Sequence, residues 1–122
     1  MDKERLVVLR DLYRDGLLDD TIPFWQSRII DKEYGGYLNY RDADGSLLST
    51  DKAVWVLGRI IWMWSRFYNT IEKRDEWLDV AQHGVDFMLK HAFDTDGRMF
   101  YLLAQDGRPL RKRRYLYTET FG

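Results

Sequence analysis

Hydrophobic side chains occupy residues 54–68 so densely that a helix there is apolar on almost every face. They fall on two adjacent stripes with helical spacing: Val54, Leu57, Ile61, Trp64 and Tyr68 on one, and Val56, Ile60, Met63 and Phe67 on the other. A surface helix needs only one stripe, so the pattern predicts a helix buried by neighbours on several sides. Arg59 falls within it, in register with Trp55, Trp62 and Arg66. Because an unpaired guanidinium is costly to bury, we expect Arg59 to meet an acid, carbonyl groups, water or a ligand.

The spacing of hydrophobic residues also predicts helices before and after this segment. Residues 2–18 form an amphipathic helix with Leu6, Leu9, Tyr13 and Leu17 on one face. Capping residues 19–21 and Pro23 predict a kink and a renewed helix through Ile30. Residues 49–51 are predicted to cap the apolar helix, and the opening of a fourth helix begins at Tyr115.

An outer helix is predicted to begin near Asp75. Its buried stripe is expected to be Leu78, Ala81, Val85, Met88 and Ala92, and its solvated stripe Asp79, His83, Asp86 and Lys90. His91 falls in the last turn, where a cation suits the helix dipole. Both histidines are therefore interpreted as structural.

The order of elements repeats along the chain. Asp44-Gly45 marks a hairpin turn, and Asp106-Gly107 lies about 60 residues later, in a second hairpin predicted within residues 94–107. Such a period of outer helix, hairpin and inner helix is typical of an array or toroid. Two copies cannot close a ring, so we expect the chain to be part of something longer. The predicted class is all-α with short β-hairpins.

Composition excludes several functions. The chain has 122 residues, no cysteine and a net charge of −1, which exclude disulfides and give no field for steering onto nucleic acid or a membrane. Neither a membrane span nor a signal peptide is predicted, so the expected location is the cytoplasm. The Asp-rich turns at 42–45 and 94–97 lack calcium-loop spacing, and no metal is expected. The basic run 108–114 is interpreted as a solvated loop or subunit contact.

Aromatic residues make up 16% of the chain, including five tryptophans and eight tyrosines. Aromatic side chains line sugar-binding sites, but they also fill gaps between helices. Packing between inner and outer helices is the preferred interpretation of Trp55 and Trp62, and sugar contact is the alternative.

The segment Thr50-Asp-Lys-Ala-Val-Trp-Val-Leu-Gly-Arg-Ile-Ile-Trp-Met63 closely resembles the second-helix motif of the N-acylglucosamine 2-epimerases. Pro23-Phe24-Trp25, the stretch from Asp31 through Gly35-Gly36-Tyr37, and Asp42-Ala-Asp44-Gly45 agree with it. The resemblance covers essentially the whole chain. The wider superfamily includes cellobiose 2-epimerases, mannose isomerases and a sulfoquinovose isomerase, and the motif is more similar to the N-acylglucosamine branch.

The resemblance implies that residues 1–122 are the N-terminal portion of a single (α/α)6 barrel, truncated in the fourth helix. It implies cofactor-free proton transfer at C2 of an open-chain sugar such as N-acetylglucosamine, N-acetylmannosamine or mannose, with two histidines as base and acid. Arg59 corresponds to a residue that contacts substrate oxygens, Tyr117 matches a pocket aromatic more loosely, and Trp55 is a further candidate for substrate binding. The family's catalytic histidines lie downstream, so no catalytic residue is assigned here, and the fragment alone is expected to be inactive. The full-length protein is a possible homodimer.

Two other functions compete with this one. A non-catalytic carbohydrate-binding or interaction module on the same toroid would bind sugar without exchanging its C2 proton. A glycoside hydrolase would need two carboxylates facing the pocket, and residues 54–68 contain no Asp or Glu.

Glu119 is expected to pair with a nearby arginine.

Overall fold

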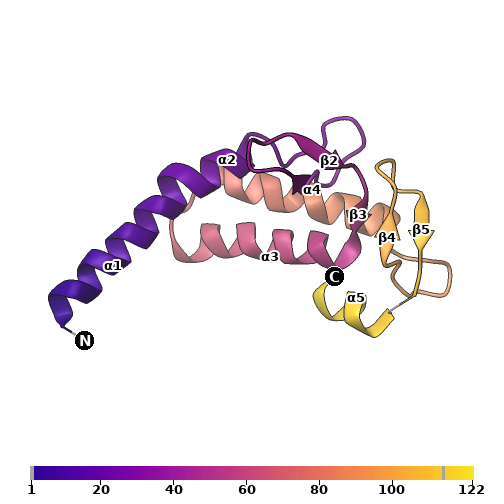
Figure 1. Ribbon diagram of the computed structural model, residues 1–122. Helices are drawn as coiled ribbons and strands as arrows, with labels where there is room; N and C mark the ends of the chain where they lie inside the picture. Colours follow the sequence, from indigo (N-terminus) through magenta and orange to yellow (C-terminus); the bar gives the residue numbers. More distant parts are fainter. Residues whose placement is uncertain (1, 114) are drawn as a thin grey trace.

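The computed structural model describes residues 2–113 and 115–122, in which helices dominate and short antiparallel strands join them (Figure 1). The helices are α1 (Lys3–Gly16), the π-helical turn η1 (Leu17–Thr21), α2 (Ile22–Gln26), α3 (Val54–Thr70), α4 (Asp75–His91) and α5 (Tyr115–Phe121). The strands are β1 (Tyr40–Arg41), β2 (Leu47–Ser49), β3 (Lys52–Ala53), β4 (Leu102–Leu103) and β5 (Pro109–Arg111). The predicted class is confirmed. Across the described residues, no helix is both long and apolar enough to cross a membrane.

Helices α3 and α4 lie antiparallel and side by side, and side chains between them form the core (Figure 1). Trp64 of α3 and Trp77 of α4 are fully buried. The ring of Phe67 meets both edge-on, at centroid distances of 5.6 and 5.8 Å. Large aromatic rings in this geometry gain about 0.5–1.5 kcal/mol per pair beyond the area they bury.

The buried face of α4 differs from the predicted face by about one residue. Its buried residues are Trp77, Val80, Ala81, Gly84, Phe87 and Met88. Leu78, predicted to be buried, is 44% exposed. The Tyr37 side chain packs against α4 at Gly84. Its hydroxyl donates to the Val80 carbonyl at 2.7 Å, and a Cβ on Gly84 would lie 2.2 Å from the hydroxyl oxygen. Gly84 therefore belongs to the packed face, although a hydrophobic pattern does not count glycine.

The N-terminal helix continues through η1 into α2 without the predicted capping. The predicted capping residues lie inside η1, and Thr21, which precedes α2, makes no side-chain capping hydrogen bond. Pro23 occupies the first turn of α2, as predicted. However, α2 ends at Gln26 rather than Ile30, where the Ser27 hydroxyl donates back to helix carbonyls.

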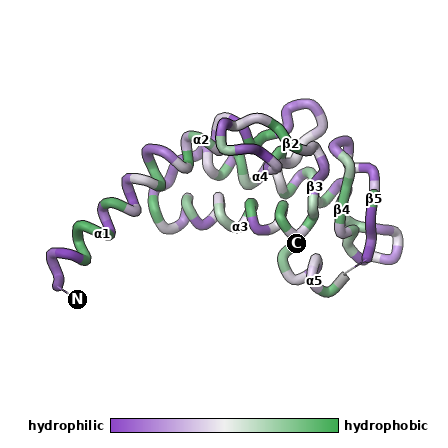
Figure 2. Tube along the Cα trace, viewed as in Figure 1, coloured by the Kyte–Doolittle hydropathy of each residue, from purple (hydrophilic) through white to green (hydrophobic). Residues whose placement is uncertain are grey.

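Helix α1 projects from the rest of the molecule (Figure 1), and none of its residues is buried. Hydrophobic residues nevertheless recur along it (Figure 2). On its predicted apolar face, Leu6 is 48% and Tyr13 74% exposed. That face has no packing partner within the described part of the chain.

Three turns of the same construction support the repeat found in the sequence. Gly45, Gly97 and Gly107 all have positive φ, between 78 and 88°, which favours glycine. In each turn, the preceding aspartate accepts a hydrogen bond from the backbone N–H two residues beyond it. The first turn joins β1 to β2 and the third joins β4 to β5, whereas the second closes a loop bridged by Phe93 and Met99. The single hairpin predicted within residues 94–107 is thus two turns.

The start of α3 is set by a sheet rather than by the predicted caps. Residues 49–51 precede β3, which pairs with β4 in the three-stranded sheet β3-β4-β5. The residue before the helix, Ala53, makes no side-chain capping bond. Instead the Val54 N–H donates to the Tyr101 carbonyl at 3.1 Å. The second hairpin therefore positions the first turn of α3.

Candidate functional site

Trp55, Arg59, Trp62 and Arg66 lie on one face of α3, opposite the stripe that packs on α4. Both arginines are exposed, and Trp62 is 53% exposed. The prediction that Arg59 is buried is wrong, because the apolar stripes turn toward α4 and the segment around α2 and leave this face open. The interpretation of the two tryptophans as packing between inner and outer helices stays a prediction: Trp55 is half-buried against α5, and Trp62 is open among the described residues.

An aromatic group forms where the first turns of α3 meet α5. The Trp55 ring contacts Tyr117 at 5.4 Å and Phe121 at 6.1 Å between centroids, and Tyr117 lies 5.4 Å from Phe121. The guanidinium carbon of Arg59 lies 5.4 Å from the Phe121 centroid. We call Trp55, Arg59, Tyr117 and Phe121 the α3–α5 site.

The α3–α5 site thus brings together the three candidate residues taken from the sequence, and adds one. Phe121 was not predicted, although it follows Tyr117 by one helical turn and so shares its face. Tyr117 is 48% exposed, so the aromatic group is partly open to solvent. Aromatic faces beside a guanidinium suit a ligand with C–H faces and oxygen atoms.

Helix α5 is held in place by an ion pair and by a close backbone contact. Glu119 accepts two hydrogen bonds from the Arg98 guanidinium, both at 3.1 Å, so its predicted pairing with an arginine is confirmed. On the other side, α5 meets α3 at Gly58: a Cβ there would lie 1.7 Å from the Phe121 carbonyl oxygen. Position 58 therefore has to be glycine for the two helices to approach this closely.

We expect Gly58→Ala to push α5 away from α3. The added methyl group meets backbone atoms, which cannot rotate aside, and overpacking of this kind costs about 1–3 kcal/mol. Separation of Tyr117 from Trp55 should follow, seen as a change in near-ultraviolet circular dichroism together with a lower melting temperature. Gly16→Ala is the matched control: nothing lies within 4 Å of its Cβ, and alanine favours the helix. Equal stability of the two variants would contradict the expected clash.

Lys52 fixes the strand that leads into α3, and the sequence reading did not find it. Its fully buried ammonium donates to Asp31 at 2.7 Å and to the carbonyls of Gly35 and Gln105, each at 2.6 Å. It also lies 4.5 Å from the centre of the Phe87 ring. All three ammonium protons are satisfied, so one side chain joins the 31–37 loop, β3 and the second hairpin.

The pKa values of Lys52 and Asp31 both lie below their ordinary ranges, for different reasons. Burial lowers the pKa of Lys52, and Asp31 opposes this only in part. Burial alone would raise the pKa of Asp31, but hydrogen bonds from Lys52 and from the N–H groups of Tyr34 and Glu33 outweigh it and lower the pKa. Asp31 is therefore held as a carboxylate.

Both histidines have contacts outside the α3–α5 site. His83 was predicted to be solvated but is half-buried, with Nε2 3.3 Å from the Asp31 carbonyl oxygen. His91 is the last residue of α4, and its ring contacts the Phe87 ring in a tilted arrangement, with the centroids 4.7 Å apart. Burial, helped by the neighbouring Lys90, lowers the pKa of His91, which opposes the cation that the helix end favours. These contacts agree with the structural interpretation of the two rings.

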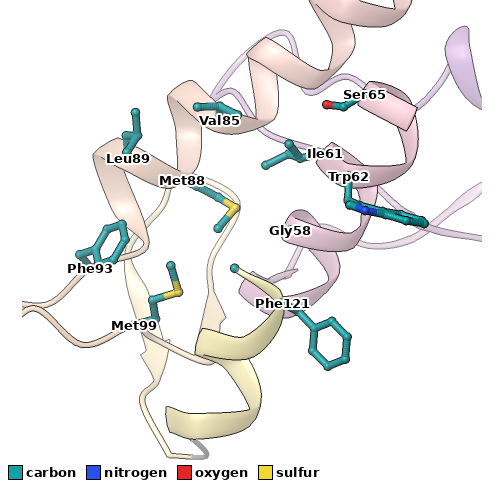
Figure 3. A pocket seen from close by; sticks show the side chains of 11 residues that line it. Gly58, Ile61, Trp62, Ser65, Val85, Met88, Leu89, Phe93, Met99 and Phe121 are labelled. Atoms are coloured by element: carbon teal, nitrogen blue, oxygen red, sulfur yellow. The ribbon is translucent and has the colours of Figure 1, made fainter. Parts of the chain in front are cut away.

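An apolar groove of about 550 Å³ lies between α3, α4 and the end of α5 (Figure 3). Met88 and Met99 point into it, whereas the rings of Trp62 and Phe121 point away (Figure 3). Among its lining side chains only Ser65 is polar. A sugar needs several hydrogen-bonding partners, so the groove does not fit one, and the α3–α5 site remains the better candidate.

The fold is one that this chain shares with carbohydrate epimerases. The sequence profile of N-acylglucosamine 2-epimerase (GlcNAc 2-epimerase) matches residues 35–122, and the chain belongs to that family. The chain is 36% identical to rat (Rattus norvegicus) N-acylglucosamine 2-epimerase over 99% of its own length, and 33% identical to Dictyoglomus turgidum cellobiose 2-epimerase over 95%. It spans about 30% of the length of each. These two identities do not separate the N-acylglucosamine branch from the cellobiose branch.

Solved structures agree with the predicted fold. A sugar epimerase from a ruminal bacterium matches 88% of the chain with a TM-score of 0.79 at 32% identity. Cellobiose 2-epimerase from Bacillus thermoamylovorans B4167 matches 93% with a TM-score of 0.84 at 25% identity. The chain covers 28% and 29% of these proteins, which have the (α/α)6 barrel fold. The helices and hairpins described above therefore form part of such a barrel, as predicted.

Proposed function

We propose that the intact protein is a carbohydrate 2-epimerase or aldose–ketose isomerase that acts on a monosaccharide such as N-acetylglucosamine, N-acetylmannosamine or mannose. The reaction is cofactor-free proton transfer at C2, and this chain contributes Arg59, Tyr117 and Trp55 to the substrate pocket. The observation that carries the proposal is the convergence of these three residues at the α3–α5 site. The names of the relatives support the class of reaction.

Arg59 has the chemistry that this reaction requires. Removal of the C2 proton from an open-chain sugar places negative charge on the neighbouring oxygen. A guanidinium presents several N–H donors in a fixed plane and stays charged at every working pH. No carboxylate competes for Arg59 within residues 2–113 and 115–122. The guanidinium is thus available to stabilise the developing oxyanion.

The aromatic residues position the sugar rather than react with it. The rings of Trp55 and Tyr117 offer apolar surface to the C–H face of a sugar, and the Tyr117 hydroxyl offers a hydrogen bond. Both catalytic histidines are assigned to parts of the protein beyond residues 1–122, because His83 and His91 make their contacts elsewhere.

Exchange of the C2 proton with solvent tests the proposal. The intact protein is incubated in D₂O with N-acetylmannosamine or with mannose, and the C2 proton signal is followed by NMR. We expect the signal to disappear as deuterium enters and, for the correct sugar, a second isomer to accumulate. Calorimetry on the same samples reports binding. Binding of the sugar without exchange of its C2 proton would contradict the proposed enzymatic activity and favour a carbohydrate-binding module.

A further inference from the structure

Two aromatic rings contact the Arg59 guanidinium on the open face of α3. The guanidinium carbon lies 5.2 Å from the centre of the Trp62 ring and 5.4 Å from the centre of the Phe121 ring. Both rings point away from the apolar groove (Figure 3). Trp62 follows Arg59 by one turn, and helix side chains lean toward the N-terminus, so its ring covers the turn that carries the arginine. Phe121 reaches the same guanidinium from α5, because Gly58 lets the two helices meet.

The contacts of Arg59 differ in kind from those of a structural arginine in the same chain. The Arg41 guanidinium donates hydrogen bonds to three backbone carbonyls. Among the described residues, Arg59 has its two ring contacts and neither a hydrogen bond nor an ion pair. An aromatic ring attracts the cation without occupying its N–H donors as an oxygen acceptor would. The rings therefore hold Arg59 while its donors stay open to a ligand.

Holding this side chain in advance matters because an exposed arginine is flexible. It has several rotatable bonds, and fixing them when a ligand binds costs conformational entropy. A donor that stabilises a developing oxyanion is most effective when it is already in place, since any rearrangement during the reaction raises the barrier. Ring contacts that exist before the sugar binds reduce this cost.

We propose that Trp62 and Phe121, here called the ring pair, are positioning residues for Arg59. They hold its guanidinium on the open face of α3 before the sugar binds and leave its N–H groups for the substrate oxygens. The inference rests on the proposed function for the part that Arg59 plays in the reaction. Neither ring is assigned a contact with the reacting atoms, so the effect of both on the reaction depends on Arg59 being present.

NMR relaxation of the arginine side chains in the intact protein, without substrate, tests whether the ring pair holds Arg59. The readout is the order parameter of the isotope-labelled Nε–H group of Arg59. Arg66 is the internal control, because its guanidinium carbon lies 5.5 Å from the centre of the Trp62 ring and only Arg59 also contacts Phe121. We expect Trp62→Leu to lower the order parameter of both arginines and Phe121→Leu to lower that of Arg59 alone. Trp62→Phe keeps a ring and should retain most of the order. An Arg59 order parameter that is unchanged in either leucine variant would overturn the role of that ring.

Turnover of the intact protein shows whether Trp62 acts through Arg59. Trp62→Leu is expected to lower kcat about 5- to 30-fold, the factor that corresponds to a cation–π contact shielded from water by the bound sugar, and Trp62→Phe should recover most of it. In an Arg59→Met background, Trp62→Leu should cause no further loss, because the side chain that it positions is absent. A loss of the same size in that background would overturn the proposal, since Trp62 would then act directly on the sugar or on the fold.

The two measurements separate this inference from the proposed function. Turnover of Arg59→Met like that of wild type, together with ring-dependent order of the Arg59 side chain, would reject the role of Arg59 in the reaction and keep the role of the ring pair. Turnover that depends on Arg59 without ring-dependent order would keep the reaction and reject the ring pair as positioning residues.

Discussion

Replacing Lys52 with methionine is expected to lower the free energy of unfolding by about 3–5 kcal/mol, because it leaves the Asp31 carboxylate buried without its counter-ion. Asp31 is 2% exposed, so water cannot take the place of the ammonium. The carbonyls of Gly35 and Gln105 lose their donor as well. A thermal or urea melt of the intact protein measures the loss.

Lys32→Met is the matched control for this substitution. Lys32 lies next to Asp31 in the same loop, but its side chain is exposed. Its replacement is expected to change the unfolding free energy by no more than about 0.5 kcal/mol. The double variant Lys52→Met with Asp31→Asn removes both charges and should be less unstable than the two single losses added together. Additive losses would show that the two side chains are not coupled.

The same pair sets a pH dependence that Asp31→Asn removes. The pKa of Asp31 is lowered below the ordinary value for an aspartate, about 3.9, so its contribution to stability is present above that value. The contribution is lost as the pH falls through the lower folded-state pKa. Lys52 stays protonated in this acidic range in both states and adds no slope. We therefore expect the wild-type protein to lose more stability below about pH 4 than Asp31→Asn does.

The local hydrophobic and turn patterns were enough to predict the helices and turns of this fold, but not which face of each helix is buried. Spacing in the sequence predicted α3, α4 and the Asp-Gly turns because each depends on neighbours within a few residues. The predicted buried face of α4 was wrong because Tyr37, which is distant in the sequence, packs against Gly84. A glycine that makes room for such a ring does not appear in a hydrophobic pattern. A near-uniform apolar pattern on α3 likewise did not show which side would stay open.

The site was predictable only in part, for a related reason. Arg59 stood out as a charge within the apolar pattern, and the binding roles of Arg59, Tyr117 and Trp55 came from a resemblance. Their convergence at one site depends on the crossing of α3 and α5 at Gly58. Lys52 and Asp31 are separated by 21 residues, and no helical or strand period links them. A lysine placed directly before a long apolar run was the available signal, because such a residue is drawn into the core and needs a partner.

Arg59→Met is expected to lower turnover of the intact protein about 10²- to 10³-fold, the loss typical of removing one donor to a developing oxyanion. Because the reaction barrier rather than the fold depends on this side chain, the melting temperature should stay close to that of wild type. The guanidinium is exposed, and its contacts with Trp62 and Phe121 contribute about 1 kcal/mol at most.

Two further variants make the result for Arg59 specific. Arg59→Lys keeps the charge but loses the planar pair of donors, so we expect it to recover only part of the activity. Arg5→Met removes an exposed arginine from α1 and should leave the kinetics unchanged. Steady-state assays with the sugar that shows C2 exchange measure all three. If Arg59→Met turned over like wild type, the guanidinium would have no part in the reaction, and the α3–α5 site would be a binding surface without a role in proton transfer.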